Sequence, residues 1–257
     1  CPGYVFSSPT PDQMLAAAEK VDSGAGVLFI VKNYSGDVMN FEMAAEMMSG
    51  PNASVLTNDD VAVEDSSFTT GRRGVAATVV VEKMVGSLAE AGGSLEECKK
   101  LGDKVNKNSG SMGVALTSCS VPAAGKPNFE IGDDEMEFGV GIHGEPGRRR
   151  DKIKSAQEIT SELLEAINED LKPEKNEEIL LFVNGMGGTP LTELYLIFDN
   201  AKNVLDKKNI KISRSLVGNY CTSLEMQGAS ITLTKLDEEL VKHWDSSVLT
   251  AAMRWGM

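Results

Sequence analysis

The run GAGVLFIVKNY, residues 24–34, restricts the possible fold more than any other feature of the sequence. It is almost continuously apolar, which is typical of a strand buried on both faces of a sheet. The segment GDVMNFEMAAEMMSG (36–50) follows it directly and has the pattern of a helix, with Asp37 near its start and Gly50 past its end. A buried strand that leads straight into a helix predicts an α/β protein.

The rest of the chain repeats this alternation. Helices are expected over residues 75–92, 94–108, 155–171, 189–208 and 238–244, and strands over 111–119, 135–142, 177–185, 213–220 and 229–236. We therefore predict two α/β domains, each a mixed sheet layered with helices. The first covers 1–109, the second covers 110–245 and carries His143, and a tail, 246–257, is expected to pack back on the first domain.

The start of the chain has neither a methionine nor a signal peptide, since it opens on Cys1 and runs into PGYVFSSPTPD. We expect that an amino-terminal segment is missing and that the first domain is incomplete at its amino terminus.

Charge and cysteine content exclude several classes of protein. The formal net charge of −13 argues against nucleic acid as a partner, because phosphates would be repelled. No run of eighteen apolar residues is present to span a membrane. The four cysteines are scattered without a CxxC pair, which favours reduced thiols and a cytoplasmic location over a disulfide framework or a zinc site.

FGVGIHGEPG (138–147) places His143 among four glycines. The letters fit G-x-G-x-x-G, but Glu145 and Pro146 follow where a dinucleotide-binding motif would begin a helix, so that interpretation is rejected. No P-loop occurs either, and the sequence shows no nucleotide site. On the residues alone, His143 is either a catalytic group or a loop histidine that hydrogen-bonds backbone.

Lys32 and Asp37 flank the turn at the carboxyl end of the first buried strand, where open α/β sheets collect their ligands. Both side chains could face a small ligand. The alternative is that Asp37 caps the following helix, and both roles could hold together.

Other conspicuous residues are expected to be structural. His243 lies on an amphipathic helix, and the arginine runs 72–73 and 148–150 are expected to be solvated. Met43, Met47 and Met48 recur at helical spacing and are expected to fill the core.

Several long motifs, in order, resemble the dihydroxyacetone-binding subunit of dihydroxyacetone kinase. The resemblance runs from FSSPTPD at residue 6 to the closing AAMRWGM, and it is carried by IVKNYSGDVMNFEMAAE, GRRGVAATVVVEK, VPAAGKPNFE, EMEFGVGIHGEPG and NGMGGTPLTELY.

The resemblance implies that His143 attacks the ketone carbon of dihydroxyacetone and forms a hemiaminal. Glycerol lacks the carbonyl and would be rejected. The surrounding glycines would let the backbone approach the ligand closely. Asp37 would accept a proton from, or orient, the hydroxyl that receives phosphate, and Lys32 and Ser8 would contact the substrate.

The resemblance also implies partners. This chain would bind neither a metal nor a cofactor, and a separate helical subunit would hold ADP with magnesium and receive phosphate from a phosphoprotein of the phosphotransferase system. An ATP-dependent donor is the variant form, and a homodimer is typical. The alternative function is a dihydroxyacetone-sensing coactivator of a transcription regulator.

The family's leading GGSGHEP loop, with a second histidine, precedes the first residue here, so we expect the chain as given to be inactive and its first domain to be less ordered.

Overall fold

The computed structural model describes residues 6–63 and 71–256. The first part of the chain forms α1 (Pro11–Val21), β1 (Val27–Lys32), α2 (Ser35–Met47), β2 (Asn52–Thr57), α3 (Ala77–Glu90) and α4 (Leu95–Lys107). The second part forms β3 (Ser109–Ala115), β4 (Ser120–Val121), β5 (Lys126–Pro127), β6 (Glu135–Phe138), β7 (Arg149–Lys152), α5 (Ala156–Leu171), β8 (Glu178–Gly185), α6 (Leu191–Lys207), β9 (Lys211–Gly218), β10 (Gly228–Lys235), α7 (Glu238–Asp245), β11 (Val248–Leu249) and β12 (Arg254–Trp255).

Two main sheets organise the described residues. The larger has six strands in the order β7-β6-β3-β10-β8-β9, of which only the β8–β9 pair is parallel. The smaller consists of β1 and β2, paired in parallel from Val27–Asn52 to Lys32–Thr57. An isolated parallel bridge between Asp60 and Ser111 connects the segment after β2 to β3. The predicted α/β class is confirmed, and the six-stranded sheet is mixed as expected, whereas the β1–β2 sheet is purely parallel.

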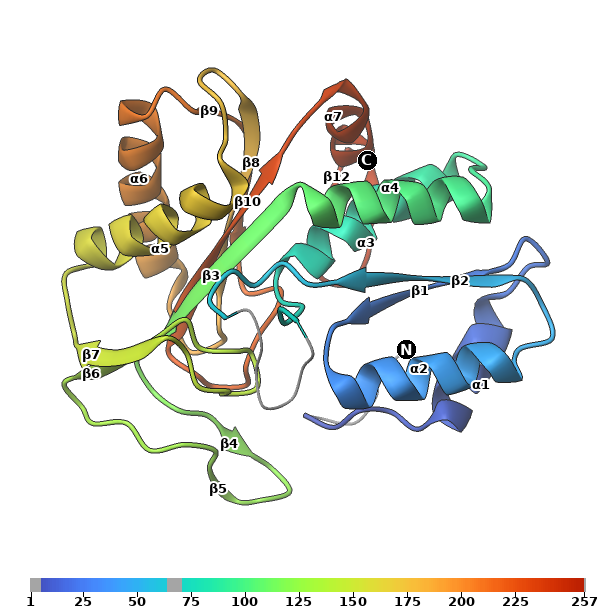
Figure 1. The fold of residues 1–257 in the computed structure, drawn as a ribbon, viewed down its shortest axis with the longest axis horizontal. Helices are drawn as coiled ribbons and strands as arrows, with labels where there is room; N and C mark the ends of the chain where they lie inside the picture. The colour runs from blue at the N-terminus through green and yellow to red at the C-terminus, as the bar shows by residue number, and fades with distance from the viewer. Residues whose placement is uncertain (1–5, 64–70, 257) are drawn as a thin grey trace.

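Helices cover both sheets (Figure 1). Helices α5 and α6 lie on one face of the six-stranded sheet, while α3, α4 and α7 gather near its other face. Helices α1 and α2 pack together on the opposite side of β1–β2 from α3 and α4 (Figure 1). The two-stranded sheet is therefore enclosed between helix pairs, which explains the apolar run that forms β1.

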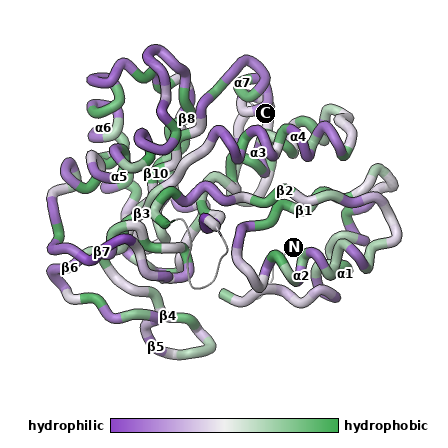
Figure 2. The backbone as a smooth tube through the Cα atoms, viewed as in Figure 1, coloured by the Kyte–Doolittle hydropathy of each residue, from purple (hydrophilic) through white to green (hydrophobic). Residues whose placement is uncertain are grey.

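Local sequence signals explain where several helices begin. Ser94 and Ser155 each cap a helix and form a reciprocal capping box with the glutamate three residues later, Glu97 and Glu158. Along α5 and α6 the chain alternates between hydrophilic and hydrophobic segments (Figure 2), as expected for helices with one face on a sheet.

The main core cluster joins both parts of the chain. It contains Val55 and Met84 from the first part together with Leu180, Phe182 and Trp244 from the second. The predicted division into 1–109, 110–245 and 246–257 stays a prediction, since the packing runs across both boundaries.

The tail contacts α3 and α7. The rings of Trp255 and Trp244 lie 5.3 Å apart, and the Lys83 ammonium lies 5.4 Å from the Trp255 ring centre.

Several expectations were wrong in detail. The strand expected over 135–142 ends at Phe138, because Gly139 adopts a φ of +83° and turns the chain out of the sheet. Met43 and Met47 are about half exposed on α2 and do not fill the core. Helix α1 and strand β2 were not predicted. The first residues, 1–5, on which the expectation of a missing segment rested, lie outside the described residues.

Over the described ranges, no helix is both long and apolar enough to cross a membrane.

Candidate functional site

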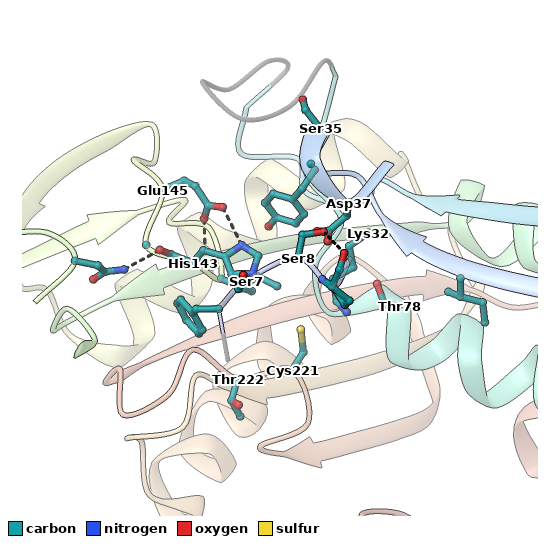
Figure 3. A pocket seen from close by; sticks show the side chains of 18 of the residues that line it. Ser7, Ser8, Lys32, Ser35, Asp37, Thr78, His143, Glu145, Cys221 and Thr222 are labelled. Atoms are coloured by element: carbon teal, nitrogen blue, oxygen red, sulfur yellow. Dashed lines mark hydrogen bonds and ion pairs between the residues drawn. The ribbon is translucent and has the colours of Figure 1, made fainter. Parts of the chain in front are cut away.

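A cavity of about 1120 Å³ opens between the β1–α2 segment and the turn that follows β6. All four residues predicted for the site, Ser8, Lys32, Asp37 and His143, line it. Figure 3 shows Lys32, Asp37 and Ser8 gathered on one side and His143 with Glu145 on the other. The structure thus brings together side chains that are up to 135 positions apart in the sequence, from Ser8 to His143.

Lys32 is the last residue of β1, and Asp37 lies in the first turn of α2. The cap of α2 is Tyr34, which makes no side-chain cap bond, so Asp37 is not the helix cap. The carboxylate of Asp37 is therefore available to the cavity, near the positive end of the helix.

Ser8 is held in the cavity wall by α2. Asn40 donates from Nδ2 to the Ser8 hydroxyl at 3.1 Å and to the Pro9 carbonyl at 2.9 Å. This contact fixes the segment before α1 against α2, the helix whose first turn carries Asp37, and both Ser8 and Asp37 line the cavity (Figure 3).

His143 sits in the turn after β6 with its side chain about one-third exposed. The rings of Phe6 and Tyr34 meet it edge-on, with ring centres at 5.1 and 4.6 Å. Asn128 donates from Nδ2 to the His143 carbonyl at 2.7 Å. The ring therefore enters the cavity from a turn that is held on several sides.

The glycines around His143 serve the turn itself. A Cβ on Gly144 would lie 2.0 Å from Asn128 Nδ2, and one on Gly141 would lie 2.0 Å from Glu145 Oε2. Close approach of side chains within the turn thus explains these two glycines, whereas the sequence had suggested close approach to a ligand.

Arg73 supports the turn from the interior of the protein. Its guanidinium is fully buried, pairs with Asp60 Oδ2 at 2.7 Å, and donates to the Gly139 carbonyl at 2.7 Å and the Pro146 carbonyl at 3.3 Å. The expectation that the arginine runs are solvated was wrong for Arg73, because its planar side chain satisfies a carboxylate and the carbonyls of the turn. It holds for the second run, 148–150, whose residues are exposed. Arg148 also donates to the carbonyls of Val61 and Ala62.

The turn after β9 forms another part of the wall. Asn184, fully buried at the end of β8, donates to the Cys221 carbonyl and accepts from the backbone N–H groups of Tyr220 and Cys221. Burial raises the pKa of the Cys221 thiol to about 11, so it stays protonated at neutral pH. Burial also raises the pKa of Tyr34, which keeps its hydroxyl neutral.

Sequence reasoning missed Glu145, Asn128 and Arg73. The signal for Glu145 was its place two residues after His143 in a glycine-rich turn, where its side chain can fold back onto the histidine. No local pattern connects Arg73 with residue 139, because the two meet only through the tertiary fold.

The chemistry of this arrangement suits a small polar ligand. A histidine ring can act as nucleophile or base, and a lysine and an aspartate opposite it can bind hydroxyl or carbonyl oxygens. Within residues 6–63 and 71–256, no three histidine, cysteine, aspartate or glutamate side chains are grouped so that they could hold a metal ion.

An α/β protein with a histidine facing a lysine and an aspartate across one cavity is a small-molecule binding protein with groups for covalent and acid–base chemistry. Comparison with known proteins is more specific: residues 1–252 match the Dak1 domain, and the chain belongs to that family.

Two curated relatives and one solved structure illustrate the similarity. The chain is 51% identical over 240 residues to a subunit of Listeria innocua named PTS-dependent dihydroxyacetone kinase 1, dihydroxyacetone-binding subunit DhaK, covering 92% of this chain and 73% of the relative. It is 44% identical to the PEP-dependent dihydroxyacetone kinase, dihydroxyacetone-binding subunit DhaK of Escherichia coli, covering 100% and 80%. The solved structure of a dihydroxyacetone kinase operon co-activator, Dha-DhaQ, superposes with a TM-score of 0.86 at 31% identity, covering 93% and 75%.

Proposed function

We propose that this protein is the dihydroxyacetone-binding subunit of a dihydroxyacetone kinase. The observation that carries the proposal is the cavity in which His143 faces Lys32, Asp37 and Ser8. Membership of the Dak1 family and the names of the two curated relatives supply the substrate and the reaction.

His143 is the nucleophile of the proposed mechanism. A ring nitrogen attacks the ketone carbon of dihydroxyacetone and forms a hemiaminal, which holds the substrate in the cavity. Glycerol has no carbonyl and cannot form this bond, so covalent capture separates two molecules of similar size and polarity.

Asp37 and Lys32 act on the captured substrate. Asp37 accepts a proton from the primary hydroxyl that receives phosphate, a role that typically contributes a factor of about 10²–10⁴. Lys32 and Ser8 donate hydrogen bonds to substrate oxygens, and the contact of Asn40 with Ser8 supports that geometry.

The phosphate comes from a separate subunit in this proposal. A helical partner holds ADP with magnesium and is recharged by a phosphoprotein of the phosphotransferase system, while this chain binds no nucleotide and no metal. The words "PTS-dependent" and "PEP-dependent" in the names of the relatives support this donor over the ATP-dependent form. A homodimer and a cytoplasmic location complete the proposal.

The co-activator structure supports a second candidate, a dihydroxyacetone sensor that acts on transcription. Such a protein needs the capturing histidine but not a base at the phosphorylated hydroxyl. The presence of Asp37 in the cavity favours the kinase subunit.

Two measurements test the proposal. Dihydroxyacetone labelled with carbon-13 at its carbonyl should give a signal of a tetrahedral carbon on the wild-type protein and on a His243→Gln control, but none on His143→Gln. With a helical partner subunit and phosphate donor, Asp37→Asn should keep that signal and lose turnover by a factor on the order of 100 or more. An adduct on His143→Gln, or near-normal turnover of Asp37→Asn, would contradict the assigned roles.

A further inference from the structure

The carboxylate of Glu145 is directed at His143 with both of its oxygens. Oε2 accepts the backbone N–H of His143 at 3.0 Å, and Oε1 lies 3.1 Å from ring Nδ1 (Figure 3). The side chain of Glu145 is only 5% exposed, so few other partners can reach it. One buried acid therefore contacts both the backbone and the ring of the same histidine.

The turn is built around this contact. The Gly141 N–H donates to the Glu145 carbonyl at 3.0 Å, and the Gly144 N–H donates to the Gly141 carbonyl at 3.0 Å, which closes the chain into a tight loop. The absence of a side chain at Gly141 leaves the space that Oε2 occupies. The loop thus has room for the Glu145 carboxylate only because residue 141 is a glycine. Any side chain at position 141 would displace that carboxylate.

The charge state of Glu145 decides which ring nitrogen of His143 carries the hydrogen. Burial alone would raise the pKa of this carboxyl, but the hydrogen bonds that it accepts from His143 and the charge of Arg73 act in the opposite direction and favour its ionised form. Glu145 is therefore ionised at neutral pH, and an ionised carboxylate only accepts hydrogen bonds. The Nδ1 atom at 3.1 Å must then carry the hydrogen.

We propose that Glu145 is a positioning residue that holds the neutral ring of His143 as the Nδ1–H tautomer, with the lone pair of Nε2 free to attack a carbonyl carbon. The inference rests on the proposed function for its chemical consequence, but the tautomer itself is a property of the unliganded protein. Edge-on packing by Phe6 and Tyr34 restricts rotation of the ring and preserves the Nδ1 contact.

The reaction step balances with this tautomer. The Nε2 lone pair forms the N–C bond, the π pair of the carbonyl moves to oxygen, and that oxygen takes one proton from a solvent water, whose hydroxide is neutralised by the buffer, so that the step consumes one proton overall. The ring then carries substituents on both nitrogens and one positive charge. The Glu145 carboxylate stabilises that charge, as a buried acid does for the imidazolium of a catalytic triad.

A purely structural role is the competing explanation, since the bond from the His143 backbone N–H to Oε2 would clamp the loop by itself. Glu137 offers a matched control for that role. It is also buried, and its Oε1 accepts the Gly147 N–H of the same turn at 2.9 Å. Its other oxygen, Oε2, pairs with Arg150 at 3.1 Å and so points to a different partner from the His143 ring.

Glu145→Gln separates the two explanations because an amide has one acceptor and one donor group. If the amide oxygen takes the backbone N–H, its NH₂ group faces Nδ1 and favours hydrogen on Nε2, which blocks attack. We expect nitrogen-15 spectra of the ring to show Nδ1–H in wild type and in Glu137→Gln, and Nε2–H in Glu145→Gln. The adduct with carbonyl-labelled dihydroxyacetone should weaken on the order of 100-fold or more in Glu145→Gln only, because a triad acid changed to its amide costs about 10⁴ through the wrong tautomer.

The outcomes are distinguishable. An Nε2–H ring in the unliganded wild-type protein overturns the inference without any variant, even if Glu145→Gln folds poorly. A Glu145→Gln protein that keeps Nδ1–H and binds the ketone like wild type also overturns it. If wild type shows Nδ1–H but forms no adduct, the tautomer assignment stands and the proposed function fails.

Discussion

Adding one methyl group at Gly141 should disable the His143 turn. The Cβ of Gly141→Ala would lie 2.0 Å from Glu145 Oε2 and 2.8 Å from Arg73 Nη1, whereas ordinary contacts begin at 3.4 Å. The carboxylate must therefore move by about 1.4 Å (3.4 − 2.0), and a carboxylate on an open surface could do so at little cost. Glu145 is 5% exposed and both of its oxygens contact His143, so movement breaks or stretches those bonds.

The size of the effect follows from the bonds involved. A hydrogen bond to a charged group contributes about 1.5–3 kcal/mol, so loss of one bond and stretching of the other costs about 2–4 kcal/mol. For a chain of this length, each kcal/mol lowers Tm by about 2–4 °C. Urea denaturation and thermal melting measure this loss, and the carbonyl adduct should weaken in parallel.

Gly86→Ala is the matched control. Gly86 lies in α3, and a Cβ added there would meet nothing within 4 Å, so alanine should stabilise the helix by up to about 1 kcal/mol. If Gly141→Ala is as stable as wild type and still forms the adduct, the close approach of Glu145 does not constrain the turn as argued.

Three further predictions concern buried polar groups. Arg73→Met should cost about 3–5 kcal/mol in urea denaturation, because Asp60 is left buried without its partner, and a loss under about 1 kcal/mol would contradict the role of the pair. Glu145 has a pKa below its unfolded value of 4.5, so its stabilisation is complete above pH 4.5 and is lost as pH falls through the folded-state pKa. Denaturation midpoints of Glu145→Gln should therefore fall less steeply than those of wild type below pH 4.5, and equal slopes would count against an ionised Glu145. Asn184→Leu should cost at least about 3 kcal/mol by thermal melting, since it leaves the backbone groups of Tyr220 and Cys221 unpaired, and a smaller loss would mean that water satisfies them.

The alternation of strands and helices was predictable because it depends on local patterns of hydrophobic residues. The buried strand at 27–32 and the helix after it appear where the sequence placed them. The strand expected through residue 142 failed because apolar residues alternate with glycines in FGVGI (138–142) and imitate a strand, while the positive φ of Gly139 is set by contacts from Arg73 and β3. Those contacts come from distant parts of the chain, and no local pattern encodes them.

In the candidate site, too, some features follow from local sequence and others only from the tertiary fold. The sequence pattern made Lys32, Asp37 and His143 candidates, and the family resemblance added Ser8 and assigned a role to each. The structure gathers all four in one cavity. Their catalytic and binding roles stay predictions. The close contacts of Gly141 with Glu145 and of Gly144 with Asn128 could not be predicted, because these neighbours meet the glycines only once the turn is folded. Close approach of the glycines to a ligand stays a prediction.

The core that passes beneath the cavity has a consequence for ligand binding. Because one hydrophobic cluster includes residues such as Val55 and Leu180 from both parts of the chain, neither wall of the cavity should melt without the other. Capture of a ligand at the cavity is then linked to the unfolding of the whole chain. At a ligand concentration about 100 times the dissociation constant, the folded state should gain about 2.7 kcal/mol. Added ketone should therefore raise the Tm of a single melting transition. Probes placed far from the cavity should then report its occupancy.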